Sequence, residues 1–259
     1  MSNIIVCYKW VADEADIRFN SVDASLDTGR ASYKISDYDR NAVEAGVQVK
    51  QAAGDELVAL TFGTNNAKKS IKDVLSRGAG KACWVNDELA AEADGFVTAE
   101  VIAAAIRKIG DYKLIICAEG ASDTFARQVG PRIGAILDIP VISSVSELQV
   151  DGNHITAKRK LEDVVESITL EGPALVCVLP EINNPPVPSL KAALEASKKP
   201  VVEYKLDDLS IDIDDLRPRT VIKGLKAYTM ERKNVLFNAG KSTDKVKRLV
   251  ENLRKEGIV

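Results

Sequence analysis

The sequence predicts an α/β protein built on a doubly wound, mostly parallel sheet. Short β-rich apolar runs alternate with helix-period segments from residue 3 to about residue 142, an order typical of strand–helix units that wind a parallel sheet covered on both faces. After Pro140 the pattern changes to hairpin-like strands, which predicts an added antiparallel region. A chain of 259 residues with 46% hydrophobic and 28% charged content can bury a core of this size.

Four apolar runs are the expected parallel strands of the first part: residues 4–8, 57–62, 82–85 and 114–117. Loops and helices follow them, and residues 40–52 and 98–109 have helical apolar spacing. In the second of these helices the apolar residues at 101, 102, 105, 106 and 109 fall on one face. That face is expected to pack on the sheet as core.

The second part of the chain is expected to form hairpins and then an extension. Residues 141–150, 155–159 and 164–170 read as antiparallel strands, with a turn at 151–153, and residues 174–179 read as a last buried strand. Prolines at 180, 185, 186, 188 and 200 surround a short helical stretch at 190–196, so we place a domain border near residue 183.

The predicted organisation is therefore a domain over residues 1–183, a segment over 184–200 and an arm over 201–259. Residues 201–238 have modest hydrophobicity and little periodicity, and residues 243–255 read as an amphipathic helix. Such a stretch cannot form a core of its own. We expect it to lie over a partner or to fold back on its own domain.

Composition excludes several classes of function. Thirty-five basic and thirty-eight acidic residues give a net charge of −3, so nucleic acid is not an expected partner. No apolar run approaches the roughly 20 residues of a membrane span, so we expect a cytoplasmic protein without membrane insertion. The cysteines Cys7, Cys83, Cys117 and Cys177 lie far apart in apolar runs and are expected to be buried thiols. His154 is the only histidine, which disfavours histidine-based catalysis, and no metal site is expected.

Ligands of open parallel sheets bind beyond the carboxyl ends of the strands. The most informative loop there follows Cys117 and contains Gly120, Ser122, Asp123 and Thr124 ahead of a helix. Free N–H groups at that helix start would seat a phosphate, and a larger side chain at Gly130 is expected to fill this seat. Alternatively, Ser122 or Asp123 simply caps the helix. The chain has neither a GxGxxG fingerprint nor a GxxxxGK[ST] loop.

Five separated blocks of sequence resemble a known family. They are IVCYKWVAD at 5–13, KISDYDRNAVE at 34–44, DVLSRGA at 73–79, DTFARQVGP at 123–131, and PSLK at 188–191 with KKP at 198–200. Together they resemble the beta subunit of electron-transfer flavoproteins, and most closely the branch linked to nitrogen fixation and to carnitine or acyl-CoA metabolism. The resemblance covers residues 3 to 200, and the rest matches the family's variable arm in character.

The resemblance implies an adenine-nucleotide-binding sheet that holds AMP or, in bifurcating members, a second FAD. It implies an electron-carrier subunit rather than a self-sufficient enzyme, paired with an alpha subunit that holds the transferring FAD. An acyl-CoA-type dehydrogenase or a quinone reductase would bind transiently. NADH-linked bifurcation stays open, because Phe125 and its neighbours depart from the bifurcating pattern. Val129 replaces a threonine of AMP-type members and lacks its hydroxyl, which favours FAD.

By position, the resemblance implies one set of cofactor contacts and one partner contact. The cofactor contacts are Cys7, Ser36, Asp37, Tyr38, Asp39, Phe62, Asp123, Thr124, Phe125, Ala126, Arg127, Gln128, Val129, Gly130, Pro131, Arg132, Ile133 and Gly134. The partner contact is Leu190, as an exposed anchor for a dehydrogenase. Its alternative is packing against its own domain.

Two other functions are weighed against this one. One is a stand-alone adenine-nucleotide-binding stress or signalling protein of similar fold, which would have no use for the weakly apolar residues 201–259. The other is an adenylate-forming enzyme, which would carry a glycine-rich loop after the first strand, where this chain has KWVADE at 9–14.

Overall fold

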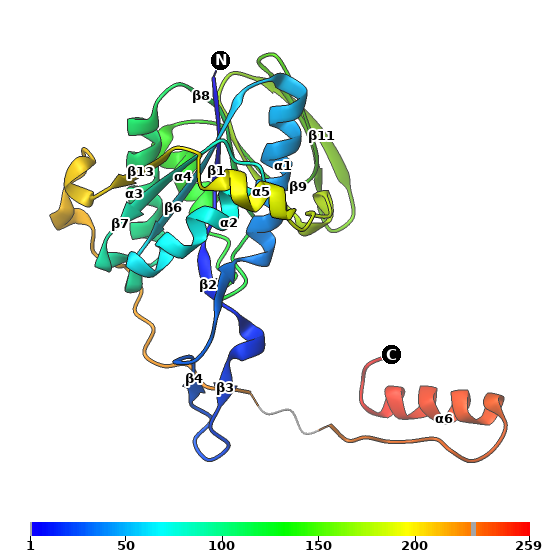
Figure 1. Ribbon diagram of the computed structural model, residues 1–259. Coiled ribbons are helices and arrows are strands. Elements are labelled where there is room, and N and C mark those ends of the chain that lie inside the picture. The colour runs from blue at the N-terminus through cyan, green and yellow to red at the C-terminus, as the bar shows by residue number, and fades with distance from the viewer. Residues whose placement is uncertain (1, 229–231) are drawn as a thin grey trace.

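Nine strands form one sheet in the order β11-β10-β9-β12-β8-β1-β6-β7-β13 (Figure 1). The computed structural model describes residues 2–228 and 232–259. The strands are β1 (Asn3–Cys7), β6 (Glu56–Gly63), β7 (Lys81–Asn86), β8 (Tyr112–Ala118), β9 (Val141–Asp151), β10 (His154–Lys160), β11 (Val165–Glu171), β12 (Ala174–Val178) and β13 (Val201–Tyr204). In the sheet order, the seven strands from β9 across to β13 are all parallel to their neighbours. β10 pairs antiparallel with β9 and with β11. The predicted fold class is confirmed.

The strand order reverses direction at β1. The chain continues from β1 to β6 and β7 on one side, and then returns to place β8 and β12 on the other side. Helices that follow strands on opposite sides of such a reversal cover opposite faces of the sheet, so the loops after β1 and β8 separate there. The reversal therefore creates the place where a parallel sheet usually binds its ligand.

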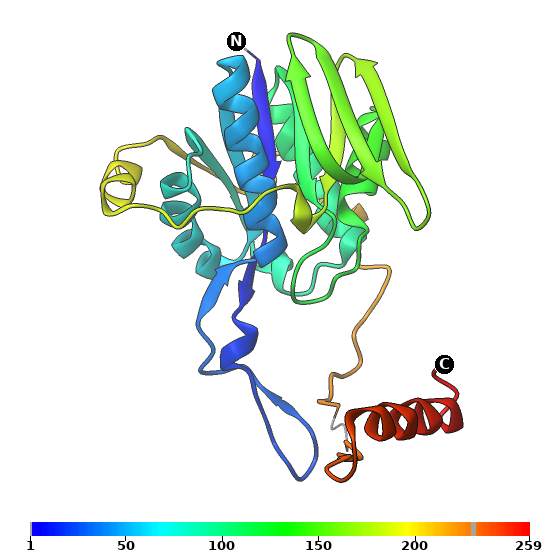
Figure 2. The same ribbon diagram turned by 90° about the vertical axis from the view of Figure 1, so that its right-hand side faces the viewer.

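Helices cover both faces of the sheet (Figure 2). The sheet therefore separates the hydrophobic core into two clusters, one under each layer of helices. α1 (Asp37–Ala53) and α2 (Ser70–Ser76) pack on one face, and α3 (Gly95–Ile109) and α4 (Val129–Leu137) pack on the other. Side chains of β1 alternate between the two clusters, because successive residues of a strand point to opposite faces. Cys7 thus belongs to the face that α3 and α4 cover.

The hairpin region matches its prediction closely. β9 and β10 are joined by a tight turn at Gly152 and Asn153, and Gly152 has a φ of 57°. A glycine adopts this left-handed conformation without steric cost, which suits the two-residue turn of a hairpin. β11 completes the antiparallel extension at the edge of the sheet.

The segment between β1 and α1 leaves the body of the protein (Figure 1). It contains β2 (Trp10–Ala12), η1 (Glu14–Asp16), β3 (Arg18–Phe19), β4 (Leu26–Asp27) and β5 (Tyr33–Ile35). β2 pairs with β5 and β3 pairs with β4, so the segment doubles back on itself as a narrow ribbon. This ribbon was not predicted, because its paired stretches are only two or three residues long and show no strand period.

The proline-rich segment leads back to the sheet. It contains η4 (Pro180–Ile182) and α5 (Leu190–Ala196), and β13 then pairs with β7 at the sheet edge. β13 was not predicted, because four residues are too few to show a period. Leu206, Leu209 and Leu216 are buried beyond it, so the chain stays packed on the α3 side until residue 216.

The remaining residues form an extended stretch and α6 (Ser242–Lys255), which lies apart from the sheet in both views (Figures 1 and 2). No residue of α6 is buried, and Val246, Leu249 and Val250 are exposed on it. Ala24 and Ser25 of the ribbon contact the stretch before α6, since Ala227 N–H donates to Ala24 O at 2.7 Å and Ser25 forms an antiparallel bridge with Lys226.

Asp94 joins the start of this stretch to α3. One carboxylate oxygen accepts hydrogen bonds from the N–H groups of Phe96 and Val97 and so caps α3. The other accepts from the N–H groups of Arg219 and Thr220, at 2.7 and 3.0 Å. The Arg219 guanidinium also lies over the Phe96 ring, 4.7 Å from its centroid, within the range of a cation–π contact. Burial raises the pKa of Asp94, but these hydrogen bonds outweigh it and hold the pKa below its ordinary value.

Asp94→Ala should both destabilise the domain and release residues 217–220. Loss of a helix cap costs about 1–2 kcal/mol of unfolding free energy, and trypsin should then cut faster after Arg219, the cleavable site in this stretch, since Arg217 is followed by Pro218. Asp87→Ala is the matched control, because the Asp87 carboxylate accepts from the local Leu89 N–H at the start of η3 (Glu88–Ala91). Equal cleavage rates in the two variants would show that Asp94 does not hold this stretch.

Candidate functional site

The candidate site lies where the loops after β1 and β8 meet. Ser36 precedes α1, and residues 119–128 connect β8 to α4. Ser122 N–H donates to the Ser36 hydroxyl oxygen at 3.1 Å, so the two segments touch across the strand reversal. The site predicted at the carboxyl ends of these strands thus coincides with the contact between the loops after β1 and β8.

Two further contacts close the same junction. Lys9 Nζ lies 2.5 Å from the Asp123 carboxylate, and the Tyr38 and Phe125 rings are 4.9 Å apart between centroids. With the Ser36–Ser122 hydrogen bond, three kinds of interaction join the start of α1 and the end of β1 to one loop. Lys9 was not among the predicted site residues. In the sequence, Lys9 is marked only by its positive charge two residues after a strand, which does not distinguish it from other lysines.

Asp39 is a buried carboxyl group at the centre of this junction, 6% exposed. Its Oδ2 accepts a hydrogen bond from Lys9 N–H at 2.8 Å. Burial raises the pKa of Asp39 to about 7, against the opposing effects of that hydrogen bond, the Lys9 charge and a hydrogen bond from Ser36. The nearby Asp123 carboxylate also raises it. Asp39 can therefore hold a proton near neutral pH.

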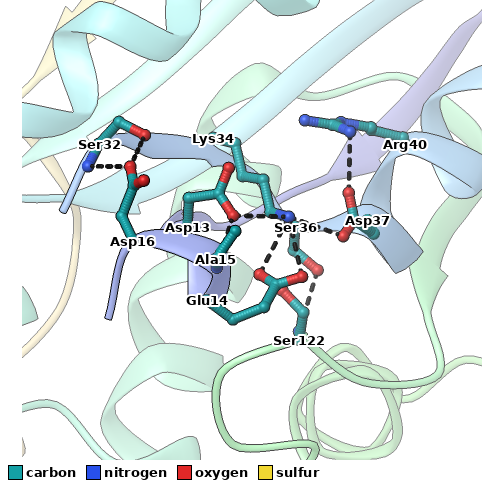
Figure 3. A network of polar contacts seen from close by, with 10 residues as sticks. All are labelled: Asp13, Glu14, Ala15, Asp16, Ser32, Lys34, Ser36, Asp37, Arg40 and Ser122. Atoms are coloured by element: carbon teal, nitrogen blue, oxygen red, sulfur yellow. Dashed lines mark hydrogen bonds and ion pairs between the residues drawn. The ribbon is translucent and has the colours of Figure 1, made fainter. Parts of the chain in front are cut away.

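A second polar network fixes the ribbon to the start of α1 (Figure 3). Lys34 Nζ contacts carboxylates of Asp13, Glu14 and Asp37 at 3.2, 2.9 and 2.9 Å, and Arg40 contacts Asp37 at 2.8 Å. Burial lowers the pKa of Lys34, but hydrogen bonds to these three carboxylates outweigh it and raise the pKa above its ordinary value. Asp37 is thus engaged in positioning the ribbon.

α4 begins later than the capping alternative requires. Its first residue is Val129 and its N-cap is Gln128, which forms no capping hydrogen bond through its side chain. Ser122 and Asp123 lie too far upstream to cap it, and Asp123 Oδ1 instead accepts from Thr124 N–H at 2.8 Å. The capping alternative is wrong. The N–H groups of the first turn of α4 have no side-chain cap within the described residues, which leaves them able to bind an anion.

Gly130 is required by packing beneath this helix start. A Cβ atom there would lie 2.4 Å from Cys177 Sγ. The expectation that a larger side chain would fill the phosphate seat is wrong, because that side chain would point into the core. Cys7, Cys117 and Cys177 end three neighbouring strands on this face, and all four cysteines are free and buried, as predicted. Burial and the neighbouring Cys117 raise the pKa of the Cys177 thiol.

The structure brings together most, but not all, of the predicted cofactor residues. Cys7, Ser36, Tyr38, Asp39 and the loop from Asp123 to Gln128 border the junction. Ile133 is fully buried against the sheet, and a Cβ at Gly134 would meet Val141 of β9, so both face the core. Phe62 is half-buried and packs on the α3 side. Leu190 lies elsewhere, at the start of α5, and is 79% exposed, so it does not pack on its own domain.

A family description for the electron transfer flavoprotein domain matches residues 24–209, more than half of the chain. The chain belongs to this family. Electron transfer flavoproteins carry electrons with a flavin-related cofactor, and they generally pair with a second subunit and with dehydrogenases. The matched region includes α1, every parallel strand except β1, and the whole loop after β8, residues 119–128. Ser36, Asp39 and the loop 119–128 therefore lie inside the matched region, whereas Cys7 and Lys9 precede it.

Two features are absent from the described residues, 2–228 and 232–259. No helix there is long and apolar enough to cross a membrane. No group of three or more His, Cys, Asp and Glu side chains in those ranges is placed to hold a metal ion.

Asp39 should make stability depend on pH between its two pKa values. The folded carboxyl, with a pKa of about 7 against an ordinary 3.8, keeps its proton when the unfolded chain loses it. The free energy of unfolding should therefore fall as pH rises from 4 to 7, by a few kcal/mol at most. Asp39→Asn should remove this part of the slope in urea unfolding.

Asp37→Asn, which alters a half-exposed carboxylate two residues earlier, is the control and should keep the slope. If Asp39→Asn and the unaltered chain lose stability in parallel from pH 4 to 7, Asp39 is not protonated in the folded state.

Proposed function

We propose that this chain is the beta subunit of a heterodimeric electron-transfer flavoprotein and holds an adenine nucleotide at the junction of the loops after β1 and β8. The observation that supports this most is the reversal of strand order at β1, with an uncapped helix start, a lysine and a buried hydroxyl group gathered around it. The nucleotide is FAD or AMP, and the heterodimer carries electrons between a dehydrogenase and an acceptor.

The residues at the junction fit a phosphate-bearing ligand. Ser122 Oγ is buried without a hydrogen-bond partner among the described residues, although buried hydroxyl groups are normally paired. The first turn of α4 offers N–H groups, and Lys9 supplies a positive charge that Asp123 now pairs. An anionic ligand would satisfy all three groups. Asp39, whose pKa burial raises to about 7, would add less opposing negative charge near neutral pH than an ordinary carboxylate.

FAD fits this chain better than AMP does. Val129 begins α4 and has no hydroxyl group with which to bind a phosphate, where AMP-type relatives have a threonine. A flavin, when bound, supplies the redox chemistry. The protein's part is to orient the nucleotide, exclude water from it and set the charge around it. Bifurcation of electrons from NADH is a further possibility within this proposal.

The C-terminal arm is the proposed contact for the alpha subunit. Residues 217–259 contain twelve Lys and Arg and four Asp and Glu, an excess of eight positive charges in a chain of net charge −3. The exposed apolar face of α6 has no partner among the described residues. A basic, amphipathic helix on an extended stretch suits an acidic surface with an apolar groove. A stand-alone nucleotide-binding protein would gain nothing from it.

The segment 184–200 is the proposed contact for the dehydrogenase. Leu190 and Leu194 lie one turn apart on α5 and are 79% and 62% exposed. Exposed apolar anchors on a short helix give an interface small enough to exchange rapidly, as an electron carrier requires.

Nucleotide content tests the proposal directly. The chain should be co-expressed with a candidate alpha subunit, and the purified complex denatured and assayed for FAD and AMP. Two FAD per heterodimer is the expected result, and one FAD with one AMP would keep the function but reverse the choice of nucleotide. Failure to form a complex, or a complex with no nucleotide in this chain, would refute the proposal.

Leu190→Ala should slow electron delivery to the partner dehydrogenase about tenfold or more, the usual cost of truncating an interface anchor, and leave cofactor content unchanged. Val165→Ala, an exposed apolar residue on β11 at 62% exposure, is the control and should leave the rate unchanged. Equal rates in both variants would remove Leu190 from the interface.

A further inference from the structure

We propose that Phe125 competes with the bound nucleotide for the face of the Tyr38 ring, so that the loop 121–128 is self-closed before the nucleotide enters. This inference rests on the proposed function, because it concerns how the same junction admits an adenine nucleotide. It adds a residue that sets nucleotide affinity.

The position of the Phe125 ring is the first observation. The ring is half-buried and lies 4.9 Å from the Tyr38 ring between centroids, at 38° to it. Tyr38 packs against the α1 side of the core. Phe125 therefore covers ring surface of Tyr38 on the loop side. Planar bases stack on aromatic rings at this kind of spacing, so a base placed on Tyr38 needs the space that Phe125 fills.

The backbone of the loop is the second observation. Phe125 has a φ of 46° and Arg127 a φ of 57°. Side-chain-bearing residues rarely adopt this left-handed region, and a bulky one there is strained. Two such residues in one short loop mean that local contacts hold it in a conformation the chain alone would not favour. The loop can release this strain by moving Phe125 away.

Contacts on both sides of Phe125 explain how the strained conformation is held. The Arg127 guanidinium lies over the Phe125 ring, 4.5 Å from its centroid, and pairs with Glu119 at 3.4 Å. Gly120 leaves room on another side, because a Cβ there would lie 2.7 Å from the Phe125 ring. Phe125 is thus seated between Gly120, Tyr38 and Arg127, and any side chain at position 120 would displace it.

The Ser36–Ser122 hydrogen bond and the Lys9–Asp123 ion pair close the same two segments. In each contact a phosphate could take the place of the acceptor, the Ser36 hydroxyl or the Asp123 carboxylate, since Ser122 N–H donates and Lys9 is a cation. The ring contact and the two polar contacts are therefore all lost or exchanged together when a nucleotide binds. The loop acts as an internal competitor that the nucleotide displaces.

AMP affinity of the nucleotide-depleted heterodimer tests this inference by calorimetric titration. Phe125→Ala removes the competing ring. Gly120→Ala leaves Phe125 in the sequence but displaces its ring, because the added Cβ atom would lie 2.7 Å from it. Each should lower the Kd for AMP about fivefold to tenfold. The double variant should bind no tighter than either single variant, because both act on the same ring. Phe19→Ala, an exposed aromatic on β3, is the control and should not change Kd.

Phe125→Leu provides a second readout in case the alanine variant misfolds. It keeps an apolar side chain next to Tyr38 and should give an intermediate Kd. Weaker AMP binding by Phe125→Ala would show that the ring supports the nucleotide and would overturn the inference. Unchanged affinity in both single variants would overturn it too. These outcomes leave the proposed function intact. Loss of nucleotide binding in the unaltered heterodimer and every variant would instead refute the proposed function, and this inference with it.

Discussion

The reversal of strand order at β1 is the constraint from which the candidate site follows. Because β6 and β7 lie on one side of β1 and β8 and β12 on the other, the helices that follow β1 and β8 cover opposite faces. The loops that lead to them must separate over the sheet edge. No specialised motif is needed to make a binding place there. The absence of a glycine-rich phosphate loop is therefore compatible with nucleotide binding in this fold.

Several polar groups at the junction lack hydrogen-bond partners among the described residues, and a ligand could supply them. Ser36 precedes α1, but its hydroxyl reaches the opposite loop instead of capping the helix. α4 starts without a side-chain cap, Ser122 Oγ is unpaired within the described residues, and burial raises the pKa of Asp39 to about 7. Each of these arrangements costs stability on its own. Their concentration at one place is the pattern expected where function has constrained the sequence.

The sequence predicted what depends on continuous apolar runs and failed where contacts join distant or short segments. Buried strands such as β1 and β8 are read directly from their apolar residues, and the Gly152 turn follows from glycine's conformational freedom. β13 and the ribbon could not be found, because their stability comes from neighbouring strands and from Lys34. The pair Lys9 and Asp123, 114 residues apart, carries no local signal. The start of α4 was misplaced because five residues of loop, 124–128, separate Asp123 from it.

The account rests on the claim that the adenine nucleotide lies between the loops after β1 and β8. Photolabelling of the heterodimer with 8-azido-AMP, followed by mass spectrometry of the labelled peptides, tests this most directly. We predict labels within residues 8–39 and 119–134 that excess AMP suppresses. Suppressible labels confined to other segments, such as the β9–β11 hairpins or α5, would contradict the placement of the site.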